Sequence, residues 1–179
     1  MLKTKRLELI DFAPSHRGFI QELDSDPEVM KYLSGGIPSD QQEVDRAMGV
    51  FLSFKEKFSG RYGYWPARLA ETGELIGWFH LRPLKACPDN YADLEIGYRL
   101  LQKFWGQGFA TEMSKALVRH GFLQLSAKRI WAHAMKANIG SQKVMKNCGL
   151  KLHSEEMYLP FPGEDKVSVW YLLDVRDFH

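Results

Sequence analysis

Hydrophobic positions in the first third of the chain have the spacing of one short strand followed by helices. Residues 6–12 alternate closely enough to predict a strand, and Pro14 then opens a helix. Asp26-Pro27-Glu28 predicts a second helix start, because an acid can cap free N–H groups and proline fits the first helical position. Ser39 and Gln42 have the spacing of a capping box, which predicts a longer helix with an apolar stripe over residues 44–58.

Strand patterns dominate the middle of the chain. Residues 64–70 and 75–82 are strand-like and are joined by Glu71-Thr72-Gly73-Glu74, a hairpin turn signal. Residues 92–101 form a third run in which apolar and charged residues alternate. Because these strands follow one another without an intervening helix, we expect them to pair antiparallel.

The second half alternates helices and strands and then ends in two strands. These elements are expected at residues 108–125, 129–135, 138–148, 152–159 and 167–173, with Gly149 capping the second helix. A strand, helix, strand order predicts a parallel β-α-β unit after the antiparallel strands. The whole pattern predicts one α+β domain over residues 1–179, with a mixed, mostly antiparallel sheet of about seven strands flanked by helices.

Composition narrows the classes of function. The 179 residues are 45% hydrophobic and 26% charged, a mixture typical of globular proteins. Net charge is only +2 with dispersed basic residues, which disfavours direct nucleic-acid binding. Cys87 and Cys148 lie far apart and predict neither a disulfide framework nor a zinc site. Since no apolar run suits a signal peptide or a membrane span, we expect a cytoplasmic protein without a membrane partner.

The segment Trp105-Gly106-Gln107-Gly108-Phe109-Ala110 falls between a predicted strand and a predicted helix. The first N–H groups of a helix lack intrahelical partners and lie at the positive end of its dipole, so they can bind an anion. Glycine lets the backbone approach a phosphate closely. The segment lacks the third glycine of a dinucleotide fingerprint and the Gly-Lys-Ser/Thr of a P-loop. Taken alone, such a segment is more often only a tight strand-to-helix turn.

Several motifs together resemble one family. Lys103-Phe104-Trp105-Gly106-Gln107-Gly108 is similar to the [QR]xxGx[GA] acetyl-CoA signature of the GNAT superfamily. Glu95-Ile96-Gly97-Tyr98 and the run 105–112 look like its RimJ/RimL branch, the ribosomal-protein N-terminal acetyltransferases and relatives. Asn138-Ile139-Gly140-Ser141, followed by Asn147-Cys148-Gly149-Leu150, resembles the NxxS…xxGF element of that branch. The resemblance covers essentially the whole chain.

The resemblance implies a GNAT-like fold whose splayed parallel unit binds acetyl-CoA, without a metal. The end of the third middle strand would pair with the pantetheine arm, and the glycine turn would hold the pyrophosphate. The implied cofactor-binding residues are Leu100, Leu101, Lys103, Gly106, Gln107, Gly108, Phe109, Ala110, Thr111, Asn138, Ser141 and Lys143. The chain departs from the family at Lys103, where Gln or Arg is usual, and at Leu150, where Phe is usual.

Acetyl transfer to an amine requires that the amine lose a proton, directly or through water. Glu95 is the best placed carboxylate for a base, and its alternative role is an ion pair with Arg99 on the same strand face. Asp93 is the second choice. Ser141 and Tyr158 are the two candidates for protonating the departing CoA thiolate.

The expected function is transfer of the acetyl group of acetyl-CoA to a primary amine, either a protein N-terminus or a small molecule, by a monomer or homodimer. The family shapes the acceptor site with segments that here are residues 35–38 and 158–165, whose acidic bias suits a cationic amine or is solvated surface. His80 and His133 are expected in the core or pocket wall rather than on a metal. The alternative function is a non-catalytic acyl-CoA-binding regulatory module.

Overall fold

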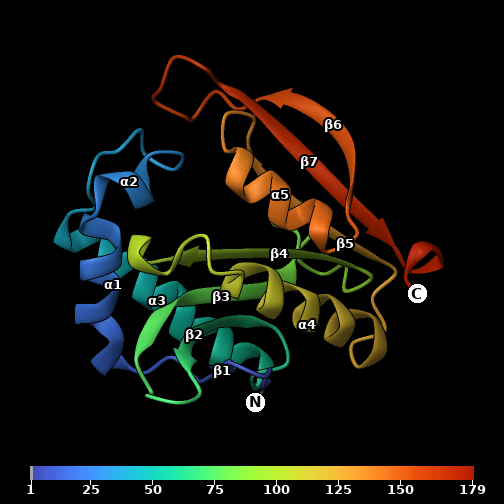
Figure 1. Cartoon of the computed structure of the whole chain (residues 1–179), viewed down its shortest axis with the longest axis horizontal. Helices are drawn as coiled ribbons and strands as arrows, with labels where there is room; N and C mark the ends of the chain where they lie inside the picture. The colour runs from blue at the N-terminus through green and yellow to red at the C-terminus, as the bar shows by residue number, and fades with distance from the viewer. Residues whose placement is uncertain (1) are drawn as a thin grey trace.

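The computed structural model describes residues 2–179, in which seven strands form one sheet flanked by helices (Figure 1). The strands are β1 (Leu7–Leu9), β2 (Gly63–Leu69), β3 (Leu75–Pro83), β4 (Asp93–Leu100), β5 (Arg129–Met135), β6 (Lys151–Met157) and β7 (Val167–Asp174). The helices are α1 (Arg17–Ser25), α2 (Pro27–Met30), α3 (Gln41–Phe58), α4 (Phe109–Leu123) and α5 (Ile139–Asn147), with short 3-10 turns at Pro14–His16, Gln102–Phe104 and Val175–Asp177.

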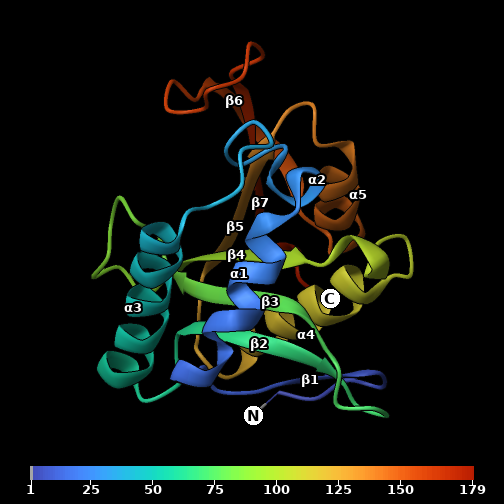
Figure 2. The same ribbon diagram turned by 90° about the vertical axis from the view of Figure 1, so that its left-hand side faces the viewer.

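The sheet has the order β1-β2-β3-β4-β5-β7-β6, and β4 with β5 is its parallel pair. Strands β1 to β4 form antiparallel pairs, and so do β5 with β7 and β7 with β6. Helix α3, packed against α1, covers one face of the sheet, and α4 covers the other (Figure 2). The predicted α+β class with a mixed, mostly antiparallel sheet is confirmed.

The parallel pair separates soon after it begins. Register between β4 and β5 runs only from Asp93↔Arg129 to Glu95↔Trp131. Beyond this point β4 stays paired with β3 up to Leu100, and β5 stays paired with β7 up to Met135. Beyond Glu95 and Trp131, the facing backbone edges of β4 and β5 are therefore not paired with each other.

Helix ends follow the predicted signals, with one correction. Asp26 caps α2 by accepting the N–H of Glu28 (2.9 Å). The capping box of α3 is formed by Asp40 and Glu43, so the prediction that it begins at Ser39 was wrong by one residue. The reason is that Asp40 and Glu43 bond each other's N–H groups (2.7 and 2.9 Å), whereas the Ser39 N–H donates to the Asp24 carbonyl.

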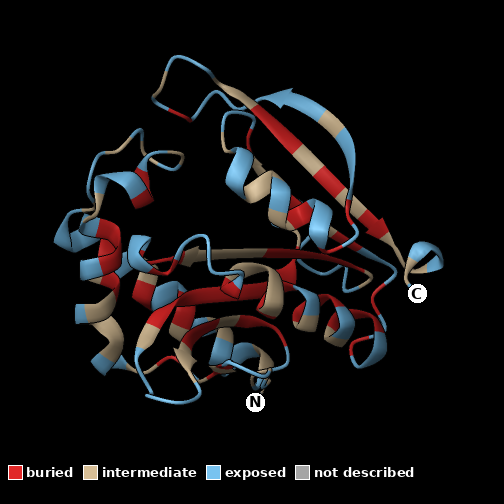
Figure 3. Ribbon diagram, viewed as in Figure 1, coloured by how far each residue is buried: buried red, intermediate tan, exposed pale blue. Residues whose placement is uncertain are grey.

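The core lies along the middle of the sheet. Strand β3 is almost entirely buried, whereas β6 is exposed along most of its length at the sheet edge (Figure 3). Gly77 lies so close to β4 that a Cβ there would stand 2.1 Å from the Arg99 carbonyl oxygen. At the end of α5, Gly149 has a φ of 88°, and the Leu150 N–H returns to the Met145 carbonyl (3.1 Å). The predicted helix cap at Gly149 is therefore confirmed.

Candidate active site

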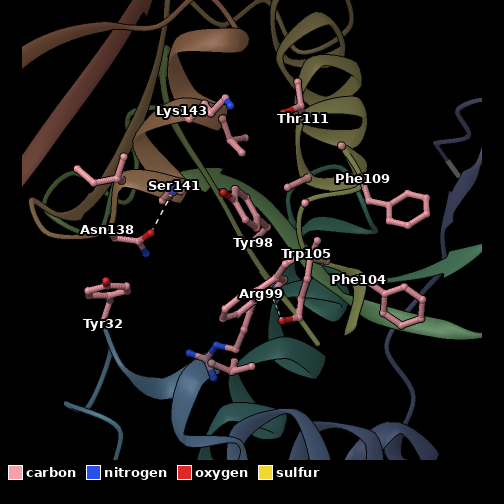
Figure 4. A pocket seen from close by; sticks show the side chains of 18 of the residues that line it. Tyr32, Tyr98, Arg99, Phe104, Trp105, Phe109, Thr111, Asn138, Ser141 and Lys143 are labelled. Atoms are coloured by element: carbon pink, nitrogen blue, oxygen red, sulfur yellow. Dashed lines mark hydrogen bonds between the residues drawn. The ribbon is translucent and has the colours of Figure 1, made fainter. Parts of the chain in front are cut away.

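A cleft of about 630 Å³ opens where β4 and β5 separate, between the start of α4 and the first half of α5 (Figure 4). Its third wall comes from α2 and the residues that follow it, including Tyr32 and Leu33. The residues from the sequence prediction that line it are Leu100, Gly106, Gly108, Phe109, Ala110, Thr111, Asn138, Ser141 and Lys143.

The glycine turn has the backbone of an anion-binding site. Gly106 and Gly108 have φ values of 73° and 80°, which favour glycine, and a Cβ on Gly106 would meet only open space. Gly108 is the N-cap of α4 and has no side chain to occupy the first N–H groups of the helix. Those donors and the positive end of the dipole face the cleft, as an oxyanion of a phosphate requires.

The outer side of the same turn is held by the N-terminal segment. The Arg6 guanidinium donates to the Gln107 carbonyl (3.0 Å) and to Glu112 in the first turn of α4 (2.6 Å), and it lies over the Phe109 ring. On the inner side, the Trp105 indole N–H donates to the Leu100 carbonyl (2.8 Å; Figure 4). The turn is thus fixed from both sides by groups that leave its N–H donors free.

Three residues in the cofactor prediction have side chains directed elsewhere. Leu101 is buried, and its N–H donates to the Ile76 carbonyl (2.9 Å). Lys103 forms an ion pair with Glu74 (2.7 Å). Gln107 donates its side-chain amide to the Lys103 carbonyl (2.8 Å). Contact of Lys103 or Gln107 with a ligand in the cleft would come from the backbone, whereas the N–H and the carbonyl of Leu101 are already bonded to Ile76 and Phe104.

The opposite wall belongs to α5. Asn138 is its N-cap, and its side-chain oxygen accepts the Ser141 N–H (3.0 Å; Figure 4). Lys143 on α5 and Thr111 on α4 lie on opposite walls of the cleft, so a cationic side chain faces the start of α4 (Figure 4). This charge complements the helix N-terminus as a binding partner for phosphate.

A smaller cavity of about 150 Å³ continues inward from the cleft. Leu33, Tyr98, Arg99, Ser141 and Val144 line both spaces and form the boundary between them, here termed the passage. Glu95 and His133 lie in the inner cavity, one on each of the two separating strands. A long ligand that entered past the glycine turn would therefore bring its end to Glu95.

Glu95 is a buried, ionised carboxylate. Its Oε2 lies 2.9 Å from Nη2 of Arg82, and its Oε1 lies 3.8 Å from Nε2 of His80 and 3.6 Å from Nδ1 of His133. Burial pushes the pKa of Glu95 upward, but His133, His80 and Arg82 together outweigh burial and lower that pKa to about 2.

The ion-pair partner expected for Glu95 was wrong. Arg99 pairs with Asp24 of α1, whereas Glu95 pairs with Arg82, which is directly opposite in the β3–β4 register. Four residues along a strand span roughly 13 Å, too far for Arg99 to reach Glu95 easily. Asp93, the second choice for a base, is held by Arg129 through two short hydrogen bonds (2.5 and 2.6 Å).

Two further groups that line the inner cavity have shifted pKa values. Burial lowers the pKa of His80 to about 3, so its imidazole is neutral at pH 7. Burial raises the pKa of Tyr98 to about 12, against the pull of a hydrogen bond with Ser141, so the phenol keeps its proton. Sequence reasoning assigned Tyr98 no role in the site, because it alternates with Leu94 and Ile96 and resembles another core residue.

Ser141 lies in the passage, but Tyr158 does not. Tyr158 follows β6, is 41% exposed, and is not among the residues that line either space. Its ring stands edge-on to His133, with 6.1 Å between centroids. The two predicted acceptor segments do meet: a Cβ on Gly35 would be 3.4 Å from Cγ of Pro162.

The fold and this cleft define a class of acyltransferase, and comparisons with known proteins agree. The family described as "Acetyltransferase (GNAT) domain" matches residues 6–151. The chain is 35% identical over 178 residues to the FsC-acetyl coenzyme A-N(2)-transacetylase of Aspergillus fumigatus, covering 95% of this chain and 74% of the relative. It is 27% identical over 154 residues to the N-acetyltransferase YoaA of Bacillus subtilis, covering 84% and 82%.

Solved structures share the fold. An acetyltransferase from Bacillus anthracis matches with a TM-score of 0.80 at 21% identity, covering 97% of each chain. The ribosomal L7/L12 acetyltransferase RimL in complex with CoA matches at 0.79 and 17%, covering 97% of each chain. A spermidine N-acetyltransferase from Vibrio cholerae with CoA and spermine matches at 0.75 and 18%, covering 97% and 98%.

The chain belongs to the GNAT acetyltransferase family and is an acyltransferase enzyme. GNAT enzymes take their acetyl group from acetyl-CoA, and the cleft has the features that a phosphate-bearing ligand requires. Within residues 2–179 no helix is long and apolar enough to cross a membrane. The same residues hold no group of three or more His, Cys, Asp or Glu side chains suited to a metal ion.

Proposed function

We propose that this protein transfers the acetyl group of acetyl-CoA to the primary amine of a small molecule. The observation that carries the proposal is that the cleft at the glycine turn, residues 106–108, adjoins the cavity that holds Glu95, with Ser141 lining both. The glycine turn suits binding of the CoA phosphates, and the ionised carboxylate suits deprotonation of the amine.

The proposed CoA contacts follow the sequence prediction. The N–H groups of residues 106–111 bind the pyrophosphate, with Lys143 supplying charge from the facing wall. The backbone of Leu100 borders the pantetheine arm in the gap between β4 and β5, and Leu101, whose own N–H is bonded to Ile76, only adjoins it. Asn138 borders the same arm while capping α5.

The proposed chemistry divides between two sides of the passage. Glu95 drives removal of the proton from the amine through a bridging group. Ser141, beside the protonated Tyr98, donates to the departing sulfur. Tyr158 stays the second candidate for this donor, and its place at the loop after β6 makes its approach depend on the acceptor.

Two observations favour a small acceptor over a protein N-terminus. The relative at 35% identity is named an N(2)-transacetylase, and segments 35–38 and 158–165 approach each other beside the cleft. The resemblance to the RimJ/RimL branch implies a protein N-terminus of the ribosomal type instead, and the RimL likeness concerns the fold alone. Both acceptor classes therefore enter the test.

The test is release of CoA thiol from acetyl-CoA with a panel of acceptors. The panel comprises spermidine, ornithine, lysine and short peptides beginning with Ser or Ala. We expect turnover with at least one small amine and at least tenfold lower kcat/KM with the peptides. Faster turnover of the peptides would overturn the small-molecule assignment.

The same experiment separates an enzyme from a regulatory module. Calorimetry would detect CoA binding in both cases, whereas only the enzyme releases thiol in proportion to acetylated amine. Tight acetyl-CoA binding without turnover of any amine in the panel would contradict the proposed function and support the non-catalytic alternative.

A further inference from the structure

Glu95 is shared by three cationic or protonatable side chains from the two neighbouring strands. Arg82 on β3 occupies its Oε2 at 2.9 Å. Its Oε1 faces two imidazoles, His80 on β3 at 3.8 Å and His133 on β5 at 3.6 Å. One carboxylate oxygen is thus committed to a permanent ion pair, and the other faces the histidines.

The two histidines differ in their access to another molecule. His80 is buried among neighbouring rings, and neither of its ring nitrogens has a hydrogen-bond partner within residues 2–179. A Cβ on Gly97 would stand 2.5 Å from its Cε1, so the ring lies flat against β4. Because burial lowers its pKa to about 3, His80 does not take up a proton at neutral pH.

His133, unlike His80, is accessible to another molecule. Its side chain is 35% exposed, and its ring is stacked on Trp170 of β7 at 4.8 Å between centroids and 23° between planes. This stacking holds the imidazole while Nδ1 faces Glu95. Nε2, on the other side of the ring, is then the nitrogen that can meet an acceptor.

We propose that His133 is the group that removes the proton from the acceptor amine, and that Glu95 is a positioning residue which orients its imidazole. This inference rests on the proposed function and names the bridging group between Glu95 and the amine. The distance of 3.6 Å from Nδ1 to Oε1 exceeds a hydrogen bond, but such contacts often shorten when substrate binds.

The proton balance of the step is complete. His133 Nε2 takes one proton from the bound ammonium group, and the freed nitrogen lone pair bonds to the thioester carbonyl carbon. The C–S bond breaks with its electron pair on sulfur, and a second nitrogen proton reaches the thiolate through the groups at Ser141. The amide nitrogen keeps one hydrogen, and His133 releases its proton to solvent from its exposed edge.

Charged and aromatic groups from four strands or their ends surround His133. Glu95 on β4 faces its Nδ1, Arg82 on β3 pairs with the other oxygen of Glu95, and His80 is neutral. Tyr158 contributes an edge contact at 6.1 Å, and Trp170 contributes an uncharged face.

The kinetic test uses the best amine from the acceptor panel and the pH dependence of kcat. His133→Gln keeps a side chain that can donate to Glu95 but cannot take a proton. We expect kcat to fall about 100-fold or more, the KM for acetyl-CoA to stay within about twofold, and the acid limb of the profile to disappear. Glu95→Gln should lower kcat by about tenfold and keep an acid limb, because His133 is still present.

His153→Gln is the matched control, because His153 on β6 is exposed and lies outside both spaces. This variant should retain the rate and the pH profile of the wild type. An unchanged acid limb in His133→Gln, with loss of that limb in Glu95→Gln, would overturn the inference and make Glu95 the base itself.

A measurement without turnover keeps the inference separate from the proposed function. NMR titration of ¹⁵N-histidine-labelled protein, with the His133 signals assigned through His133→Gln, reports the protonation of this ring directly. Glu95→Gln should change the His133 ring ¹⁵N signals at neutral pH, because Nδ1 faces the Glu95 carboxylate, and unchanged signals would contradict the positioning role of Glu95. A wild type that turns over no amine would instead refute the proposed function, whatever the NMR result.

Discussion

At the scale of single residues, the site depends on one glycine, where an added side chain would hinder binding, and on one buried carboxylate, whose charge the reaction uses. Gly108 has a φ of 80° and borders the cleft at the start of α4, where the proposed pyrophosphate contacts are backbone N–H groups. Glu95 is buried with a charge that only its neighbours stabilise. These two residues yield predictions that can be measured separately from acceptor identity.

Gly108→Val should weaken acetyl-CoA binding. The β-branched side chain disfavours positive φ and adds bulk beside the helix N–H donors. We expect the dissociation constant in calorimetry to rise at least about tenfold, or roughly 1.4 kcal/mol. Gly73→Val is the control, since Gly73 has a similar φ of 76° in the β2–β3 turn, away from the cleft. Equal affinity in the two variants would refute the role of Gly108.

Glu95 should make the protein sensitive to acid. Its pKa is lowered to about 2 in the folded state, so its ionisation stabilises the fold above its unfolded pKa near 4.5. That stability is lost as pH falls from about 5 toward 2. Urea unfolding should show Glu95→Gln less stable than the wild type at pH 7, with the difference shrinking between pH 5 and pH 3. A constant difference would contradict this assignment.

At the scale of elements, the start of α4 is held by a segment more than 100 residues away in the sequence. Arg6 and Thr4 both bind Glu112 in the first turn of the helix, at 2.6 Å each, and Arg6 also holds the Gln107 carbonyl. Arg6 does not line the cleft, yet it fixes the turn that does. Preorganisation of this kind lowers the cost of ordering a binding loop.

Arg6→Ala should therefore weaken acetyl-CoA binding from outside the cleft. We expect the dissociation constant to rise about three- to tenfold, because the turn would have to be ordered on binding. Arg68→Ala removes a comparable ion pair, with Glu8 at 2.7 Å on β1, which does not touch the turn. Calorimetry on both variants should show the loss of affinity in the first alone.

Elements were predictable from the sequence where their signals are local. β5 has the predicted bounds of residues 129–135, and the Asn138 and Gly149 caps define α5, because periodicity and capping residues act within a few positions. The Arg82–Glu95 pair was missed because it depends on the β3–β4 register across the loop at residues 84–92. The neighbourhood of Glu95 and His133 likewise depends on two strands pairing over a helix.

At the scale of the whole molecule, the substrate site lies along the seam between two parts of the sheet. Helix α4 packs mainly on β4, in the first part of the sheet, and α5 packs on β5, in the second part. The register between β4 and β5 is limited to three residue pairs. A ligand in the cleft contacts both sides of this seam. Binding should therefore stabilise the molecule as a whole as well as its cleft.

Acetyl-CoA at 100 times its dissociation constant should stabilise the protein by about 2.7 kcal/mol and raise its Tm. Hydrogen exchange should slow most at the end of β4 and at the starts of α4 and α5. The exposed strand β6 serves as an internal reference, since it lies at the far edge of the sheet. Protection confined to α4, with none in α5, would contradict binding across the seam.

The early separation of β4 and β5 also bears on which thioesters the enzyme can use. The backbone edges along the gap would bind the pantetheine arm in the same way for every acyl-CoA, because this arm does not change with the acyl chain. Discrimination by chain length is then left to the inner cavity of about 150 Å³, bounded by Trp78, His80 and Ala132. We expect propionyl- and butyryl-CoA to bind about as tightly as acetyl-CoA but to react progressively more slowly, so that longer thioesters compete as inhibitors.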